Sequence, residues 1–396
     1  MEIFPQTFAV GEQFGVVLVP LAEAGGATKA VEVATFRSDV GYSDGRHPDE
    51  VRFTRDPRED VERRDFTING MMLDPLVLDT TTNEILDFVG GRADLKAGII
   101  RAIGDPERRF GEDKLRMLRA VRFAARFEYR IDPATMAAIQ KLALQIHQVS
   151  CERIREELTK MLTEGRARRA FQLLDESKLL PEVLPEIAAM KGVAQPPQYH
   201  PEGDVFVHTL LLLDKLPAGC SKTLAWGALL HDVGKPPTFR VAPDRIRFDG
   251  HVDVGVKMAA EICRRLRFSN YETDQILALV DNHMRFGDVQ RMKQSTLKRF
   301  FRLPQFDEHL ELHRMDALSS NGNLDGYEYT LDQMRSMPPE AIRPQLLLTG
   351  RDLIEAGYEP GPRFKEVLAA VEDAQLEGRL TSREAAMEYV RREFPV

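Results

Sequence analysis

The stretch EDKLRMLRAVRFAARF, residues 112–127, decides the fold, because the hydrophobic pattern of the chain changes there. Its apolar residues Leu115, Leu118, Val121 and Ala125 recur at the three- and four-residue spacing of a helix. Arginines recur beside them at Arg116, Arg119, Arg122 and Arg126. The stretch therefore predicts a helix that carries a row of guanidinium groups next to its apolar face.

On either side of this stretch the chain reads differently. Residues 14–19 (FGVVLV) and 30–37 (AVEVATFR) predict strands, and residues 38–60 predict a loop rich in Gly, Asp, Arg and Pro. From about residue 110 helical patterning continues almost to the end. The sequence thus predicts an α+β protein with a small α/β head and a long helical body. The strand at 14–19 has no evident neighbour before it, so we expect an unpaired strand edge there.

Composition limits the classes of protein that fit. The 396 residues hold 54 Lys+Arg against 62 Asp+Glu, a net charge of −8 that argues against a generic nucleic-acid coat. Three scattered cysteines and the lack of a long apolar run fit a cytoplasmic protein with no membrane partner. Two stretches are locally basic, with nine Lys+Arg against five Asp+Glu in 101–130 and six against one in 285–302. Such stretches neutralise phosphates or form solvated helix faces.

The segment RRDFTIN, residues 63–69, gathers two arginines, a carboxylate and an amide around two apolar residues. Arg63 and Arg64 can hold phosphates by forked hydrogen bonds, and Asn69 can bind a sugar hydroxyl or a phosphate. A solvated charged loop beside buried Phe66 and Ile68 explains the segment equally well.

The segment EDKLRMLR, residues 112–119, is more informative. On a helix, Arg116 shares a face with Asp113, three residues before it, and with Glu112, four residues before it. A carboxylate acceptor beside a guanidinium donor can read both kinds of group on a nucleobase edge. The competing interpretation is an ordinary surface ion pair.

The order of the motifs carries a family resemblance. The chain gives EVATFR (32–37), YSDGRHP (42–48), RRDFTINGM (63–71), DFVGGRADL (87–95), RAIGDPERRF (101–110) and EDKLRMLRAVRF (112–123). This succession resembles the class II tRNA nucleotidyltransferase and bacterial poly(A) polymerase family. The resemblance implies ATP and CTP as substrates and tRNA as partner. It also implies that Gly90–Gly91 is a hinge. The residues that it implies for nucleotide binding are Arg64, Asp65, Asn69, Glu112, Asp113, Arg116, Arg119 and Arg122.

The sequence departs from the family at its catalytic motif. In the family, an Asp-x-Asp pair on a strand holds two Mg²⁺ ions, and no such pair precedes RRDFTIN here. We therefore expect a truncated head whose Mg²⁺ ligands are mostly missing and whose catalytic residues are unknown, so that this chain adds no nucleotide. If it does add nucleotides, Glu32, Asp39 and Asp44 are the first candidates for a replacement site.

A second group of polar residues lies between 200 and 316. Four histidines and two aspartates stand in separate segments that look helical: His208, His231, Asp232, His251, His283 and Asp316. Imidazole with carboxylate suits Mn, Fe, Ni, Co or Zn, and such a site can activate water against a phosphate ester. A lone histidine on an apolar face is more often a core residue, but the number and order of these argue for ligands.

The order of this second group resembles the HD phosphohydrolase domain. His208, His231, Asp232 and Asp316 match the family's metal ligands. His251 and His283 match the additional ligands that some HD domains use, and Lys235 in LLHDVGKP is implied as a phosphate contact. The alternative is a scaffold that binds metal structurally.

Together with the helical patterning, the two resemblances imply four domains. They are a truncated nucleotidyltransferase head at 1–105, a helical neck at 106–195 that binds nucleotide and RNA, an HD domain at 196–330 and a helical tRNA-binding tail at 331–396. The resemblance implies addition of CCA to tRNA 3′ ends from CTP and ATP. The alternatives are a poly(A) polymerase, an RNA-binding HD phosphohydrolase and a catalytically silent tRNA-binding protein.

Overall fold

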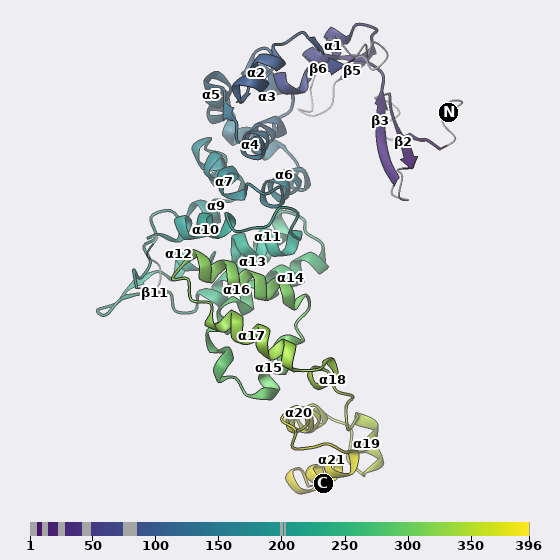
Figure 1. Cartoon of the computed structure of the whole chain (residues 1–396), viewed down its shortest axis with the longest axis vertical. Helices are drawn as coiled ribbons and strands as arrows, with labels where there is room; N and C mark the ends of the chain where they lie inside the picture. The colour runs from purple at the N-terminus through teal and green to yellow at the C-terminus, as the bar shows by residue number, and fades with distance from the viewer. Residues whose placement is uncertain are drawn as a thin grey trace. The chain divides into compact units, whose positions relative to one another are not determined.

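The computed structural model describes residues 6–9, 15–22, 28–41, 49–73, 85–198, 201 and 203–395. The chain divides into two compact units, which are described separately. The first comprises 1–189 with 217–219 and 265–267, and the second comprises 190–216, 220–264 and 268–396. The α+β class predicted from the sequence is confirmed (Figure 1). None of the helices in the described ranges is long and apolar enough to span a membrane.

The first unit opens with short strands and continues as helices. Its elements up to residue 189 are β1 Phe8–Ala9, β2 Val16–Ala22, β3 Thr28–Ala34, β4 Arg37–Val40, β5 Glu50–Phe53, α1 Pro57–Glu62, the 3-10 helix η2 Thr67–Asn69, β6 Met71–Leu73, β7 Ile85–Asp87, α2 Gly91–Ala97, β8 Ile99–Ile100, α3 Pro106–Glu112, α4 Leu115–Phe127, β9 Arg130–Ile131, α5 Pro133–Leu142, the 3-10 helix η4 Ala143–Gln148, α6 Cys151–Thr163, α7 Ala167–Glu176, α8 Leu180–Val183 and α9 Pro185–Ala188.

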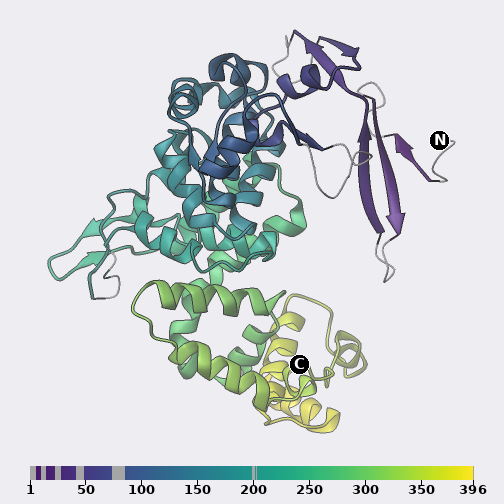
Figure 2. The ribbon, with the colours of Figure 1, turned by 45° about the horizontal axis from the view of Figure 1, so that its top comes forward.

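The strands of the first unit form small sheets. β1, β2 and β3 make an antiparallel sheet in which β2 is the central strand, with Val16 opposite Ala34 and Phe8 opposite Leu18. Figure 2 shows β2 and β3 as a long two-stranded ribbon. The expectation of an unpaired strand there is wrong, because β2 bonds to a neighbour on each side. Phe14, the motif at 42–48 and Asp44 lie outside the described residues.

The predicted loop at 38–60 is also partly wrong. It contains most of β4, all of β5, and the start of α1. α1 begins where Asp56 accepts a hydrogen bond from the Arg58 N–H, and Pro57 occupies the first helical position, where its missing N–H costs nothing. α1 therefore leads directly into the RRDFTIN segment at 63–69.

The amphipathic helix predicted at 112–127 is observed from residue 115 as α4. Met117, Leu118 and Val121 are completely buried, and α4 packs against α6 and α7. The helix does not include Asp113, because the backbone there is extended and separates α3 from α4. Glu112 and Arg116 therefore lie on two helices and not, as predicted, on one.

The second unit is almost entirely helical. Its elements are α10 Val205–Leu213, α11 Lys222–Leu230, α12 Lys235–Thr238, β10 Arg240–Val241, β11 Ile246–Arg247, α13 His251–Arg265, α14 Asn270–Asn282, the 3-10 helix η5 His283–Arg291, α15 Gln294–Phe301, α16 Phe306–Ser319, α17 Asp325–Ser336, α18 Pro339–Ile342, α19 Gly350–Glu355, α20 Arg363–Leu376 and α21 Arg383–Glu393. α11 packs against α14, and α10 packs against α16.

Two apolar clusters follow in the second unit. Phe286 of η5, Phe300 of α15 and Phe306 of α16 pack against one another. Leu353, Val371 and Val390 belong to a separate cluster that joins α19, α20 and α21. The tail helices therefore have a core of their own, and α20 also packs against α15.

Candidate functional sites

A cavity of about 530 Å³ in the first unit brings together most of the residues predicted to bind nucleotide. Its wall is formed by Arg63, Arg64, Asp65, Asn69, Asp113, Arg116, Arg119 and Phe123. The RRDFTIN loop and the start of α4 are 40 to 50 residues apart in the chain, and the fold places them on one wall. The cavity is therefore lined by guanidinium groups and two carboxylates, with one aromatic ring.

The RRDFTIN loop is held in place by close backbone packing and internal hydrogen bonds. Asp65 Oδ1 accepts from the backbone N–H of Phe66 and from Asn69 Nδ2, both at 2.9 Å. Asp65 Oδ2 accepts from Arg119 Nε at 2.8 Å, which joins the loop to α4. Gly91 allows this arrangement, because a Cβ there would lie 2.3 Å from the carbonyl oxygen of Thr67. This close approach explains why residue 91 is a glycine. A hinge at Gly90–Gly91 stays a prediction.

Sequence reasoning missed the residue that positions the two arginines. Asp60 is 2% exposed, and its two carboxylate oxygens accept hydrogen bonds from Arg63 and Arg64 at 2.6–3.2 Å. Burial by itself would raise the pKa of Asp60, but the bonds from Arg64 and Arg63 hold it below its ordinary value. The carboxylate therefore stays ionised near neutral pH and anchors both guanidinium groups.

Asp113 and Arg116 face the same cavity despite the break between α3 and α4. Arg116 donates to Glu112 Oε2 at 2.7 Å and to the carbonyl oxygens of Arg109 and Arg63 at 3.0 Å. A guanidinium has five N–H donors, so these three bonds leave two. Asp113 accepts from Leu115 N–H and from Arg153 at 2.7 Å, and each oxygen keeps a second lone pair.

Arg122, also predicted to face the nucleotide, is placed elsewhere. It is 6% exposed and donates through Nε to Glu157 at 2.6 Å, with Glu164 at 3.5 Å. Its guanidinium lies 4.3 Å from the centre of the Phe123 ring, which lines the cavity. Arg122 thus supports the cavity wall from behind and is not one of the residues that line it.

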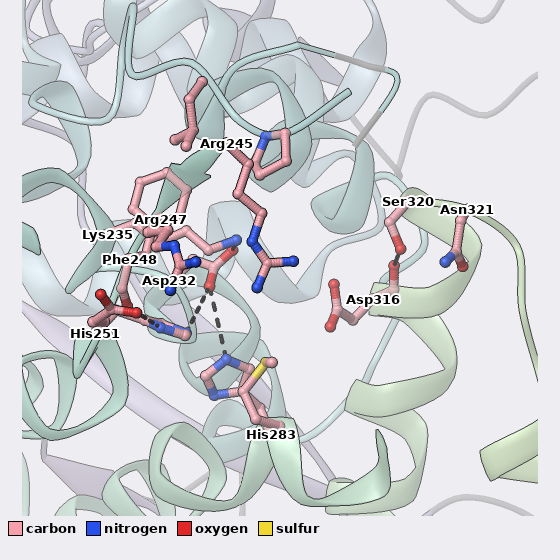
Figure 3. Close-up of a pocket in the computed structure, with 14 residues that line it drawn as sticks. Asp232, Lys235, Arg245, Arg247, Phe248, His251, His283, Asp316, Ser320 and Asn321 are labelled. Atoms are coloured by element: carbon pink, nitrogen blue, oxygen red, sulfur yellow. Dashed lines mark hydrogen bonds and ion pairs between the residues drawn. The ribbon is translucent and has the colours of Figure 1, made fainter. Parts of the chain in front are cut away.

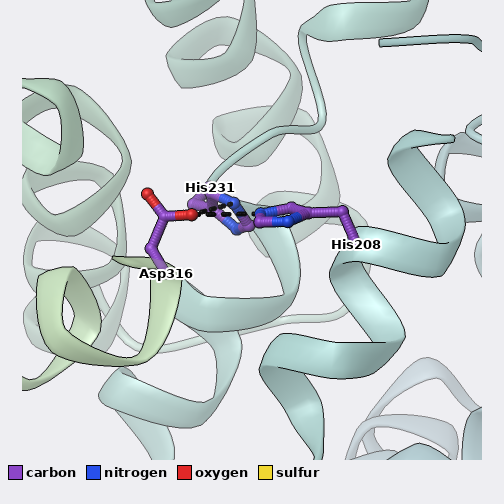
Figure 4. Close-up of side chains that lie close together, drawn as sticks. All are labelled: His208, His231 and Asp316. Atoms are coloured by element: carbon purple, nitrogen blue, oxygen red, sulfur yellow. Dashed lines mark ion pairs between the residues drawn. The ribbon is translucent and has the colours of Figure 1, made fainter. Parts of the chain in front are cut away.

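The predicted metal ligands of the second unit come together in two groups. The possible ligand atoms of His208, His231 and Asp316 lie within 4.8 Å of one another, as do those of Asp232, His251 and His283 (Figures 3 and 4). These six residues are supplied by α10, the end of α11, the starts of α13 and η5, and the middle of α16. Within the described residues these are the two groups of this kind.

Three of the imidazoles are oriented by backbone carbonyl groups. The Nδ1 atoms of His231, His251 and His283 lie 2.8, 3.0 and 2.7 Å from the carbonyl oxygens of the residues three positions earlier. A carbonyl oxygen only accepts, so each Nδ1 carries the proton and each Nε2 presents its lone pair. These Nε2 atoms are buried and have no hydrogen-bond partner among the described residues. Metal-binding histidines are oriented in this way.

The protonation states of these groups suit a cation. Burial lowers the pKa of His283 to about 4, so this imidazole is neutral at pH 7. Burial alone would raise the pKa of Asp232, but His231 and Lys235 hold it well below its ordinary value. Its Oδ1 lies 3.8 Å from His251 Nε2 and 3.7 Å from His283 Nε2. A neutral His283 imidazole beside an ionised Asp232 carboxylate fits the ligand set of a transition metal.

Lys235, predicted to contact phosphate, lines the cavity next to these ligands. The cavity measures about 420 Å³ and also contains Asp232, His251, His283 and Asp316 (Figure 3). Lys235 Nζ lies 2.6 Å from Asp232 and donates to Gln195 at 2.7 Å, which leaves one of its three donors. Gln195 was missed by the sequence reasoning, since it stands outside the LLHDVGKP motif.

The basic stretch at 285–302 is largely occupied within the protein. Arg299 and Arg302 pair with Glu372 on α20, and Lys298 donates to the carbonyl oxygen of Leu376. Half of the six basic groups therefore join α15 to the tail. A count of charges did not reveal this, because the partners are about 70 residues away.

Comparisons with known proteins identify the family. Three family models match the chain: the poly A polymerase head domain at residues 1–101, the probable RNA and SrmB-binding site of polymerase A at 128–191, and the HD domain at 205–321. They leave the four predicted domain boundaries as predictions.

Similar proteins agree as well. A multifunctional CCA protein of Burkholderia ambifaria is 32% identical over 362 residues, covering 88% of this chain and 82% of that protein. A CCA-adding enzyme of Lactobacillus helveticus is 30% identical over 98% of this chain and 84% of its own length.

Solved structures resemble this one over its whole length. The CCA-adding enzyme of Bacillus stearothermophilus in complex with CTP is 26% identical and has a TM-score of 0.71, covering 99% of this chain and 86% of that one. The Thermotoga maritima CCA-adding enzyme complexed with tRNA has the same fold, with a TM-score of 0.53 at 19% identity, covering 98% and 81%. From these matches we conclude that the chain belongs to the family of CCA-adding nucleotidyltransferases that carry an HD domain.

Proposed function

We propose that the cavity of the first unit binds CTP and ATP for addition of CCA to the 3′ end of tRNA. The observation that carries this proposal is the joint placement of Asp113 and Arg116 with the RRDFTIN residues around one space of about 530 Å³. The B. stearothermophilus structure was solved with CTP, and the T. maritima structure with tRNA.

Asp113 and Arg116 select the base in this proposal. Cytosine and adenine each present an amino group that the Asp113 carboxylate can accept from, next to a ring nitrogen that a free Arg116 donor can reach. Uracil and guanine present a carbonyl oxygen where the amino group would be, and this oxygen would face the carboxylate. Glu112 keeps the Arg116 side chain in place for this role.

The remaining residues hold the sugar and the phosphates. Arg64 is 35% exposed and has its guanidinium anchored by Asp60, so it can bind phosphate without reorganisation. Asn69 and Asp65 offer an amide and a carboxylate for the sugar hydroxyls, and Arg119 links Asp65 to α4. Arg122 contributes indirectly, by supporting Phe123.

The described part of the first unit does not fit the two Mg²⁺ ions of the family reaction. Asp39 is engaged by Arg37 at 3.1 Å, and Glu32 lies exposed on β3; among the described residues neither belongs to a group of three or more possible ligands within 4.8 Å of one another. We therefore propose that the described residues of the first unit bind nucleotide without themselves holding the two Mg²⁺ ions.

Nucleotide binding tests the proposal independently of catalysis. Isothermal titration of the full chain should show tighter binding of CTP and ATP than of UTP and GTP. Arg116→Ala should reduce this preference by about 10- to 100-fold, since recognition of a base through a pair of hydrogen bonds contributes about 1–3 kcal/mol of discrimination. Arg126→Ala on the same helix is the matched control, because Arg126 is exposed and lies outside the cavity wall.

An unchanged preference in the Arg116 variant would overturn the assignment of the base reader. Binding of ATP alone would favour the poly(A) polymerase alternative.

For the second unit we propose a metal-dependent phosphohydrolase. The observation behind it is the set of buried Nε2 atoms that lie, with Asp232 and Asp316, in two adjoining groups of possible ligands. His208, His231, Asp232 and Asp316 would hold a transition metal, with His251 and His283 as additional ligands. A bound metal would supply an activated water molecule for attack on a phosphoester.

Metal content and hydrolysis test this second function together. Asp232→Ala should lose both the bound metal, measured by elemental analysis, and phosphomonoester hydrolysis. Asp253→Ala, an exposed aspartate on α13, should change neither. Metal bound in the natural chain without any hydrolysis would make the centre structural. A metal-free chain after reconstitution with Mn, Fe, Ni, Co and Zn would exclude the site.

A further inference from the structure

A small hairpin forms one wall of the metal cavity. β10 and β11 pair antiparallel, with Arg240 opposite Arg247 and Val241 opposite Ile246. The hairpin closes through a hydrogen bond from Ala242 N–H to the carbonyl oxygen of Arg245 at 3.0 Å. The last turn residue, Arg245, and the return strand residues Ile246 and Arg247 line the cavity of about 420 Å³ that contains the predicted metal ligands.

Among the described residues, Arg245 is the cation of this cavity wall for which no hydrogen bond or ion pair to another side chain is found. Figure 3 shows its side chain extending into the space between Asp232 and Asp316. The other charged groups of the wall are engaged, since Lys235 pairs with Asp232 and Asp249 pairs with Arg240 at 2.7 Å. Over the described residues, the Arg245 guanidinium makes no hydrogen bond or ion pair, so its donors are available to a ligand.

Arg247 adds a second donor. Its Nη2 atom lies 2.8 Å from Asp244, which holds the side chain from the turn of the hairpin. Its Nε–H is buried and finds no acceptor in the described part of the chain. A buried donor without a partner is costly, and an anion bound in the cavity could accept from it.

We propose that Arg245 and Arg247 bind the phosphate of a small phosphate monoester and hold it against the metal centre. This inference rests on the proposed phosphohydrolase function and names its substrate class. Guanidinium groups match phosphate oxygens through forked hydrogen bonds. Two guanidinium groups attract a dianionic monoester more than a monoanionic diester. A cavity of about 420 Å³ is the size of a small-molecule site and not of a folded RNA.

Binding of inorganic phosphate tests this role without catalysis. The full chain is loaded with Mn²⁺, and phosphate binding is measured by isothermal titration. Arg245→Gln and Arg247→Gln should each weaken binding by about 10- to 100-fold, because each removes charge-assisted hydrogen bonds. Metal content should stay unchanged. Arg264→Gln, an exposed arginine on α13 outside the cavity wall, is the matched control and should bind phosphate normally.

Kinetics give a second measurement. With 4-nitrophenyl phosphate, the Arg245 variant should show a KM raised by about tenfold or more, with a smaller change in kcat. With the diester bis(4-nitrophenyl) phosphate, the rise in KM should be smaller. Arg245→Lys should recover part of the affinity, since it keeps the charge but loses the fork.

The outcomes separate this inference from the function on which it rests. Arginine-dependent phosphate binding in a natural chain that hydrolyses no ester would support the inference and refute the phosphohydrolase. If both glutamine variants bind phosphate with the same affinity as the natural chain, the inference is overturned. The absence of phosphate binding in the metal-loaded natural chain would overturn it as well.

Discussion

Replacing Asp60 by Asn tests whether one buried carboxylate organises the nucleotide cavity. Asp60 Oδ1 accepts from Arg63 Nε and Nη2 at 3.0 and 2.6 Å, and Oδ2 accepts from Arg64 Nε and Nη2 at 3.2 and 2.8 Å. The backbone N–H of Arg37 adds a weaker bond at 3.3 Å. Asparagine keeps the shape, removes the charge and directs an NH₂ group at a guanidinium.

The size of the effect follows from these bonds. A hydrogen bond to a charged group contributes about 1.5–3 kcal/mol, and two arginines lose their anchor. The arginine side chains are 24% and 35% exposed, so water replaces part of the loss. We expect the free energy of local opening around α1 to fall by about 2–4 kcal/mol, a factor of about 30 to 1,000 in the opening equilibrium.

The pH dependence has a definite sign. The pKa of Asp60 in the folded protein lies below its ordinary value, which is about 3.9 when unfolded. The stabilisation is therefore fully present above about pH 5, declines as the pH falls through the unfolded pKa, and is lost below the folded pKa. The difference between the natural chain and Asp60→Asn should be constant from pH 7 to about pH 5 and should shrink at lower pH.

Hydrogen–deuterium exchange of residues 57–73 measures local opening, and calorimetry measures CTP affinity. Glu59→Gln is the matched control, because Glu59 lies on the same helix, is exposed and undergoes the same change of charge. Trp226 is the single tryptophan and lies in the second unit, so its fluorescence should report unchanged unfolding. Exchange that differs from the natural chain by less than about 0.5 kcal/mol would refute the anchoring role.

Three further changes have defined outcomes. Glu157→Ala should destabilise the first unit by about 3–5 kcal/mol, since it leaves buried Arg122 with Glu164 alone at 3.5 Å. Glu156→Ala, at an exposed position on the same helix, is the control. Equal denaturation midpoints of the two variants would contradict the expectation. Burial, with the charge of Arg285, lowers the pKa of His309 to about 4. Protonation of this group should therefore reduce the stability of the second unit by up to roughly 3 kcal/mol as the pH falls from about 6.5 to 4. His309→Gln should make that decline smaller when unfolding is followed by Trp226 fluorescence. Labelled CTP and ATP should not be incorporated into tRNA that lacks its 3′ end. Nucleotide addition with a kcat near roughly 1 per second would contradict this, and Glu32, Asp39 and Asp44 would then be mutated to locate the metal site.

Local patterns in the sequence were sufficient to predict the long helices. The apolar spacing of α4 predicted its buried face, because a helix of 13 residues shows several repeats of the pattern. β4 and β5 have only four residues each and were read as loop, since their pairing with each other, with Arg37 opposite Phe53, is what defines them. The break at Asp113 was equally hidden, because it depends on local backbone geometry within a run of good helix formers.

The sites divide in the same way. Residues that recur in a recognisable order, such as His231 and Asp232, could be named from the sequence. Asp60 could not, because PREDVE contains three acidic residues and only the fold shows which one is buried beneath Arg63 and Arg64. Charge counts failed for α15 for a related reason, as the acidic partners on α20 are distant in sequence.

The surroundings of a buried carboxylate determine what each cavity can bind. Asp60 is surrounded by N–H donors from Arg63, Arg64 and Arg37, so its lone pairs are occupied and the neighbouring cavity is left with guanidinium groups that attract anions. Asp232 is equally buried, but the imidazoles of His251 and His283 direct lone pairs toward the same space. Asp232 Oδ2 pairs with Lys235 at 2.6 Å, whereas Oδ1 faces the two imidazoles, and lone pairs that converge in this way favour a cation. The same residue type thus suits one cavity to the proposed nucleotide and the other to the proposed metal, and the nitrogen atoms around it make the difference.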